Sequence, residues 1–179
     1  MDWAGILRFC RLILRRITSP ADASRPPESA PLSYKAFKKL AYKTFHKYGF
    51  QPHGGKLQRC TDTTKEDIVV YKSRFSSEVF IDANIWYLRL GDGPATDTEL
   101  DYHVSIRISR CVPNAQLSAI DSEKIATEEA ATILLRNLAE QVETELFIPA
   151  RDERNLVAIK QYEWARAAYY SPILELPPS

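Results

Sequence analysis

Three polar residues of the sequence, Asp82, His103 and Ser105, have the side-chain types of a hydrolytic triad. Such a triad needs its serine on a sharp, exposed turn beside an oxyanion hole. Ser105 instead lies inside an alternating, strand-like run, and no G-x-S-x-G motif surrounds it. His103 and Ser105 share one side of that run simply because strands have a period of two residues. We therefore expect no catalytic residues and no enzymatic activity.

The histidines and cysteines are too scattered to indicate a metal site. His46, His53 and His103 fall in a helical, a loop and a strand-like segment, without an HxH or HExxH spacing. The three cysteines are odd in number and widely spaced, which is typical of free thiols in a reducing cytosol. No glycine-rich phosphate loop is present. We expect neither a metal nor a cofactor.

The composition is that of an ordinary globular protein. Of the 179 residues, 45% are hydrophobic and 26% are charged, and 24 Lys and Arg stand against 23 Asp and Glu for a net charge of +1. This balance gives no bulk attraction to nucleic acid, so we do not expect it as a partner. No run reaches the roughly 20 apolar residues of a membrane span, and we expect a cytoplasmic protein.

Residues 1–17 form a predicted amphipathic, basic helix. Its apolar side includes Trp3 and Ile6, and its other side carries Arg8, Arg11 and Arg15. Three interpretations stay open: the helix packs on its own domain, it lies on an anionic membrane or in a partner's groove, or it is a targeting segment that is removed. Residues 18–32 contain four prolines and are predicted to be an extended linker.

Residues 33–170 are predicted to form a single α+β domain, followed by a frayed tail at 171–179. Ser33 can cap a first helix that ends at Gly49. Strand-like runs follow at 55–61, 67–76, 79–90 and 102–112. Short connections between them favour an antiparallel meander. A helix from Asp121 or Ser122 to about residue 147, and another at 151–170, complete an α-β-β-β-β-α-α order with one sheet face covered by helices.

Alternation along these runs assigns the side chains to two faces. In the second run we expect Val69, Tyr71 and Phe75 to point toward the helices. The opposite face is predicted to be exposed to water, either simply solvated or used for recognition. Trp86 would anchor a protein partner there, because Trp and Arg dominate the energetics of interfaces. The predicted partner-binding residues are Lys72, Arg74, Asp82, Asn84, Trp86, His103 and Arg107.

The order of motifs resembles that of DUF4304, a family of bacterial domains of unknown function. A helix ends in Gly49-Phe50, and a short strand containing Gly55-Lys56 follows. The family's F-x-x-N-x-x-x-Y and H-x-x-x-R-I-x-R patterns correspond here to the positions Phe80, Ala83, Tyr87, His103, Arg107 and Arg110. Ala83 replaces the usual asparagine, although Asn84 is adjacent, and the tryptophan that often follows the last strand is absent. The resemblance covers about residues 34–148.

This resemblance implies an α+β domain without established catalysis. Because related small domains occur beside polymorphic toxins, it also implies an immunity protein that neutralises a cognate bacterial toxin. Our leading hypothesis is therefore a non-enzymatic, cytoplasmic protein-binding domain. Two alternatives remain: a membrane-associated or targeted adaptor that uses residues 1–17, and a domain that binds a small ligand or nucleic acid on the polar sheet face.

Overall fold

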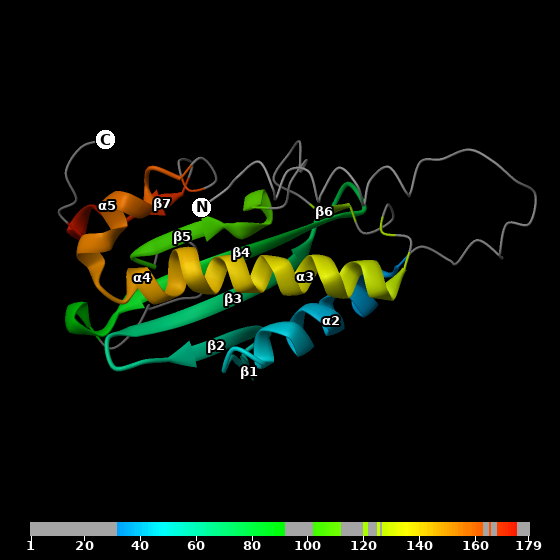
Figure 1. Cartoon of the computed structure of the whole chain (residues 1–179), viewed down its shortest axis with the longest axis horizontal. Helices are drawn as coiled ribbons and strands as arrows, with labels where there is room; N and C mark the ends of the chain where they lie inside the picture. The colour runs from blue at the N-terminus through cyan, green and yellow to red at the C-terminus, as the bar shows by residue number, and fades with distance from the viewer. Residues whose placement is uncertain are drawn as a thin grey trace, which may run out of the picture.

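The computed structural model describes residues 32–91, 102–111, 120–121, 125, 127–162, 165 and 168–174. They form an α+β domain in which helices lie across one face of an antiparallel sheet (Figure 1). The predicted fold class is confirmed. The predicted helix at 1–17, including Trp3, Ile6, Arg8, Arg11 and Arg15, lies outside the described residues, as does almost all of the predicted linker.

Within the described part of the chain, the sheet has seven strands in the order β1-β2-β3-β4-β5-β7, with β6 paired to β4. The strands are β1 (Gln51–His53), β2 (Lys56–Cys60), β3 (Thr64–Lys72), β4 (Glu78–Tyr87), β5 (Val104–Arg107), β6 (Ile120–Asp121) and β7 (Tyr169–Tyr170). All pairings are antiparallel. The four predicted strands correspond to β2–β5, and β1, β6 and β7 are short additions at their sides.

Two long helical elements cover the sheet. Helix α2 (Tyr34–His46) begins as predicted, because the Ser33 hydroxyl accepts a hydrogen bond of 3.2 Å from the Ala36 amide. Helix α3 (Glu128–Val142) is capped by Thr127, whose hydroxyl accepts from the Ala130 amide at 3.0 Å. The predicted cap at Asp121 is wrong, because Asp121 belongs to β6 and its backbone pairs with the start of β4. The alternative cap, Ser122, lies outside the described residues.

The chain after α3 is more broken than predicted. Helix α3 continues as a π-helical turn (Glu143–Phe147) and a short α4 (Ile148–Ala150) that contains Pro149. The predicted helix at 151–170 is wrong, because the Asp152 side chain caps a separate turn (Glu153–Asn155) before the four-residue α5 (Leu156–Ile159). The tail packs as far as Leu174, which is buried.

The helix-covered face of the sheet, called the helix face below, carries the core. In β4 it presents Ile81, Ala83 and Ile85, all buried as predicted. In β3 the predicted assignment is wrong, because Ile68 and Val70 stand opposite Ala83 and Ile81 and are buried with them. The run of four apolar residues at 68–71 allows either assignment, and pairing with β4 decides between them. Val69 and Tyr71 therefore lie on the other face, called the polar face below.

Candidate functional site

The polar face brings together five of the seven predicted partner-binding residues. Asp82, Asn84 and Trp86 alternate along β4, beside His103 and Arg107 at the two ends of β5. The other two predicted residues are elsewhere. Lys72 pairs with Val79, which places it on the helix face, and Arg74 lies in the turn beyond the end of β3. Both are exposed.

The predicted exposure of the polar face is wrong for most of its members. Asp82, Asn84 and His103 are at most 4% exposed, while the Arg107 side chain is 30% exposed. Part of the cover comes from Tyr102, just before β5. Its hydroxyl bonds Asp67 on β3 and Lys56 on β2, so its ring reaches across β4, which lies between them.

Asp82, Tyr71 and Arg107 form a closed hydrogen-bonded group. The Tyr71 hydroxyl donates to Asp82 Oδ2 at 2.7 Å, and Arg107 donates from Nε to Asp82 Oδ1 at 3.1 Å and from Nη2 to the Tyr71 oxygen at 2.6 Å. The Arg107 guanidinium also lies 4.6 Å from the ring centroid of Phe80. The group fixes β5 to β4 and β3.

His103 is held by its backbone surroundings and by Trp86. Its Nδ1 accepts a hydrogen bond of 2.9 Å from the Tyr87 amide, so the ring carries its proton on Nε2 when neutral. The Trp86 ring stacks on His103 with centroids 4.0 Å apart, and Trp86 Nε1 donates to the Gly91 carbonyl. The stacked rings of Trp86 and His103 therefore cover the polar face at the C-terminal end of β4.

The triad suggested by the residue types does not form in this arrangement. The Ser105 hydroxyl donates to Asn84 Oδ1 at 2.7 Å, not to a histidine. His103 uses its Nδ1 on the backbone, and Asp82 binds Tyr71 and Arg107. Among the described residues, no group of three His, Cys, Asp or Glu side chains is placed to hold a metal ion.

A second buried group on the polar face links β2, β3 and Tyr102. Lys56 Nζ lies 2.9 Å from Asp67 Oδ2 and donates to the Tyr102 oxygen at 2.8 Å, while the Tyr102 hydroxyl and Gln58 also donate to Asp67. Asp67 is fully buried, and the Lys56 side chain is 8% exposed. Burial and the bond to Asp67 raise the pKa of Tyr102 well above its ordinary value.

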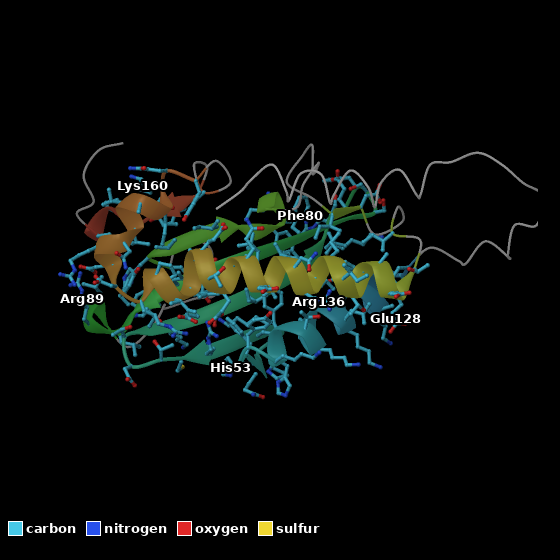
Figure 2. All side chains as sticks on the ribbon, viewed as in Figure 1. His53, Phe80, Arg89, Glu128, Arg136 and Lys160 are labelled. Carbon is cyan, nitrogen blue, oxygen red and sulfur yellow. The ribbon has the colours of Figure 1, made fainter. Side chains whose placement is uncertain are left out.

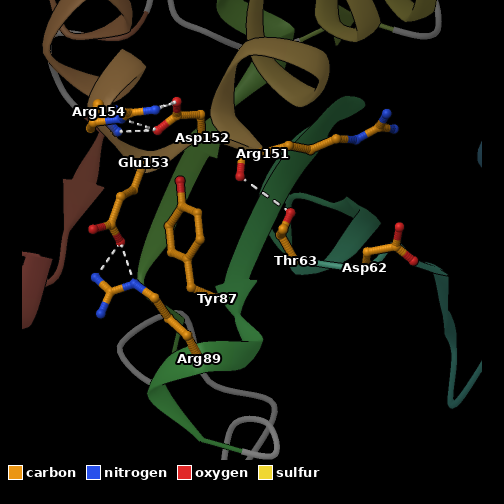
Figure 3. Close-up of a pocket in the computed structure, with 8 residues that line it drawn as sticks. All are labelled: Asp62, Thr63, Tyr87, Arg89, Arg151, Asp152, Glu153 and Arg154. Atoms are coloured by element: carbon orange, nitrogen blue, oxygen red, sulfur yellow. Dashed lines mark hydrogen bonds and ion pairs between the residues drawn. The ribbon is translucent and has the colours of Figure 1, made fainter.

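Sequence reasoning missed a cleft at one end of the sheet (Figure 3). One hollow of about 490 Å³ lies between the β2–β3 turn, the end of β4 and the segment after α4. A second hollow of about 410 Å³ shares part of this wall and adds Ile148 and Pro149. Residues that line the first hollow are Asp62, Thr63, Tyr87, Arg89, Arg151, Asp152, Glu153 and Arg154.

Three arginines surround the first hollow, and each has an acidic neighbour. Arg89 donates from Nε and Nη2 to the same oxygen of Glu153, and Arg154 forms a two-pronged pair with Asp152. Within the described residues, both Arg89 bonds converge on that one oxygen, so its Nη1 end is open to a further acceptor. The Arg89 side chain is 57% exposed.

The third arginine, Arg151, connects the cleft to a buried charge cluster. Its guanidinium lies 3.4 Å from Glu66 and 3.6 Å from Glu143. Arg59 binds the same two acids more closely, with Nε donating to Glu66 at 2.7 Å and two nitrogens donating to Glu143. Because the π-helical turn begins at Glu143, this turn supplies one wall of the cluster. The sequence signal for the cleft was the charged run 151–154, which begins two residues after Pro149.

The histidine beside the cleft gives a pH prediction. Burial lowers the pKa of His103 below 6.5, and the positive charge of Arg89 lowers it further. The unfolded chain then binds a proton more readily than the folded chain, so His103 makes the free energy of unfolding fall as the pH drops through 6.5. In urea titrations between pH 7.5 and 5, we expect His103→Gln to remove part of this loss. An unchanged profile in His103→Gln would contradict the assignment.

No family model, curated protein or solved structure matches this chain. The described helices include none that is both long enough and apolar enough to cross a bilayer. The resemblance to DUF4304 therefore depends on the motif residues alone. Ala83 and Tyr87 are buried, Phe80 lies on the polar face beside Arg107, and His103 and Arg107 join the hydrogen-bonded groups described above.

Proposed function

We propose that the protein is a non-catalytic, protein-binding domain that takes an acidic segment of its partner into the arginine cleft. The observation that supports this is the combination of three arginines with exposed apolar side chains at one end of the molecule. Leu88 adjoins Arg89 and is 36% exposed, and Ile148 lines the second hollow and is 50% exposed. Arginine and apolar groups around a hollow are the composition of a protein-binding hot spot.

The cleft is a stronger candidate than the polar face for geometric reasons. On the polar face, Asp82, Asn84 and His103 are buried and use their polar atoms on neighbouring groups. A partner would have to displace those bonds. At the cleft, Arg89 and Arg154 are exposed, and a carboxylate can join them without opening the core.

The biological setting that we propose is the neutralisation of a cognate bacterial toxin, as the resemblance implies. A chain with a net charge of +1 is poorly suited to cover a strongly basic toxin surface. Local arginines in a cleft are better suited to a toxin that presents carboxylates. The immunity interpretation thus predicts a partner with an acidic, partly apolar docking segment.

Charge reversal in the cleft tests this proposal. In the double variant Arg89→Glu, Arg154→Glu, we expect binding to the product of the neighbouring gene to weaken at least roughly 30-fold, the effect of losing one hot-spot residue. Isothermal titration calorimetry of the purified proteins gives the affinity, and growth of cells that express the toxin shows neutralisation. Both arginines are exposed, so the fold should persist in the variant.

Two further variants separate the cleft from other surfaces. Arg136→Glu reverses an exposed charge on α3, near the middle of the molecule, and should bind like the wild type (Figure 2). Trp86→Ala and Arg107→Glu change the two predicted partner-binding residues of the polar face that remain partly exposed. If these two lose binding while the cleft variant retains it, the site is on the polar face and the cleft proposal fails.

A further inference from the structure

The turn that joins β3 to β4 presents a phenylalanine to solvent. Phe75 is 97% exposed, whereas the other exposed large apolar side chains of the described chain are only 36–50% exposed. Leaving an entire phenyl ring in water forgoes the stabilisation that burial of that ring would give. Phe75 is therefore the most exposed large apolar side chain of the described residues.

This turn is built to hold Phe75 at its apex. The Ser73 amide donates to the Glu78 carbonyl at 2.8 Å and closes the hairpin, and the Phe75 amide donates to the Ser73 hydroxyl at 3.1 Å. On the returning side, the Ser76 hydroxyl bonds the Glu78 carboxylate. Ser77 donates to Asp121 on β6 at 2.6 Å, which fastens the base of the turn. The serine side chains of the turn thus form hydrogen bonds within the turn and at its base, while the Phe75 ring is exposed to solvent.

Positive charges flank the ring. Lys72, the last residue of β3, and Arg74, in the turn itself, are both exposed. The two acids at the base of the turn, Glu78 and Asp121, accept hydrogen bonds from serines. Helix α2 begins beside the end of β3, since the Tyr34 hydroxyl donates to the Val70 carbonyl at 3.1 Å. Its exposed lysines follow at a spacing of four residues, at positions Lys35, Lys39, Lys43 and Lys47. The α2 sequence contains no acidic residue.

We propose that the turn at residues 73–77 inserts Phe75 into the interfacial layer of an anionic membrane, with Lys72, Arg74 and Lys35 on lipid phosphates. An aromatic ring buried at the acyl boundary with cations at headgroup level is the arrangement of peripheral membrane anchors. Helix α3 begins at this same end with the exposed Glu128, which restricts the contact to the turn and the start of α2 (Figure 2). This site is separate from the arginine cleft and does not depend on the proposed function.

Sedimentation of the full chain with sucrose-loaded vesicles tests the proposal. We expect binding to vesicles of 70% phosphatidylcholine and 30% phosphatidylserine, and little binding to phosphatidylcholine alone. Phe75→Ser should lower the partition coefficient roughly ten-fold, by losing the burial of one ring. Ile133→Ser, which changes an exposed apolar residue on α3, should partition like the wild type. Residues 1–17 are present in all proteins, so their contribution is constant in this comparison.

A depth measurement distinguishes insertion from simple charge attraction. In Phe75→Trp, the added fluorescence should be quenched by lipids brominated near the headgroup end of the acyl chain, beyond the quenching of wild-type tryptophans. The proposal fails if the wild type does not bind anionic vesicles, if Phe75→Ser binds as well as Ile133→Ser, or if the new tryptophan is not quenched. A change in self-association of Phe75→Ser without a change in vesicle binding would assign the turn to an interface between copies of the chain and would also overturn it.

Discussion

Replacing Arg59 with methionine is expected to lower the free energy of unfolding by about 4 kcal/mol, the cost of leaving buried charges without a partner. The Arg59 side chain is 11% exposed and donates hydrogen bonds to Glu66, to Glu143 and to the Tyr48 carbonyl. Without it, the buried Glu66 keeps, within the described part of the chain, its bond from Thr64 and the longer contact with Arg151. The Arg59 guanidinium lies 4.3 Å from the ring centroid of Phe50 and 5.3 Å from that of Phe147. Methionine retains much of the packing against these two rings, so the loss is mainly electrostatic.

Equilibrium urea unfolding at pH 7 measures this effect. The triple variant Arg59→Met, Glu66→Gln, Glu143→Gln removes the stranded charges and should recover most of the stability, because apolar or neutral replacements of a whole buried ion group are often tolerated. Arg154→Met, at an exposed pair, should leave the urea midpoint unchanged. A loss in Arg59→Met no larger than that in Arg154→Met would show that the cluster does not stabilise the fold.

Asp67→Ala is expected to cost about 3 kcal/mol for a different reason: it removes the carboxylate of a buried ion pair. Lys56 would keep the Tyr102 hydroxyl as an acceptor, but its carboxylate partner at 2.9 Å would be gone. Gln58 and the Tyr102 hydroxyl would also lose their common acceptor. Because Tyr102 covers the polar face through these bonds, the variant should also loosen the segment that precedes β5.

Two measurements check this expectation. Urea unfolding should show the loss in Asp67→Ala and its partial recovery in Asp67→Ala, Lys56→Met, where both charges of the buried pair are removed. Hydrogen exchange should show faster exchange at the His103 amide, which donates to the Ile85 carbonyl. Asp62→Ala, an exposed acid in the β2–β3 turn, is the matched control. Equal stability of the Asp67 and Asp62 variants would contradict a structural role for the buried pair.

The sequence predicted the architecture because its signals are local. Alternation in β4 and β5, the Ser33 cap and the positive-φ Gly49 each depend on neighbours in the chain, and all were confirmed. The faces of β3 were assigned wrongly because Ile68 and Val69 are equally apolar and the choice depends on register with β4. The cap of α3 was assigned wrongly because Asp121 and Thr127 are both residue types that cap helices and lie only six positions apart. The choice depends on the pairing of Asp121 with β4, which leaves Thr127 as the cap.

The candidate site was harder to predict because it depends on contacts between distant segments. Alternation placed Asp82, Asn84 and Trp86 on one face correctly, but it could not show that Tyr102 would reach across that face. The cleft is lined by residues near positions 62, 89 and 152. Because residues 151–170 were predicted to form one helix, the contribution of residues 151–154 to the cleft was not predicted. The turn at residues 73–77 was missed for another reason. The predicted strand ran to residue 76 and placed Phe75 in the core, whereas β3 ends at Lys72 and leaves Phe75 exposed.

The length of β3 has a mechanical consequence. Its nine residues from Thr64 to Lys72 run between the cleft and the β3–β4 turn, a distance of about 30 Å at 3.3 Å per residue. This distance exceeds the electrostatic screening length of roughly 8 Å in physiological salt, so charges at the two ends of β3 interact little with each other. If the turn contacts a lipid bilayer, Arg89 lies too far from the lipid phosphates to bind them. The strand would then hold the cleft away from the membrane surface, where a protein in solution can bind it.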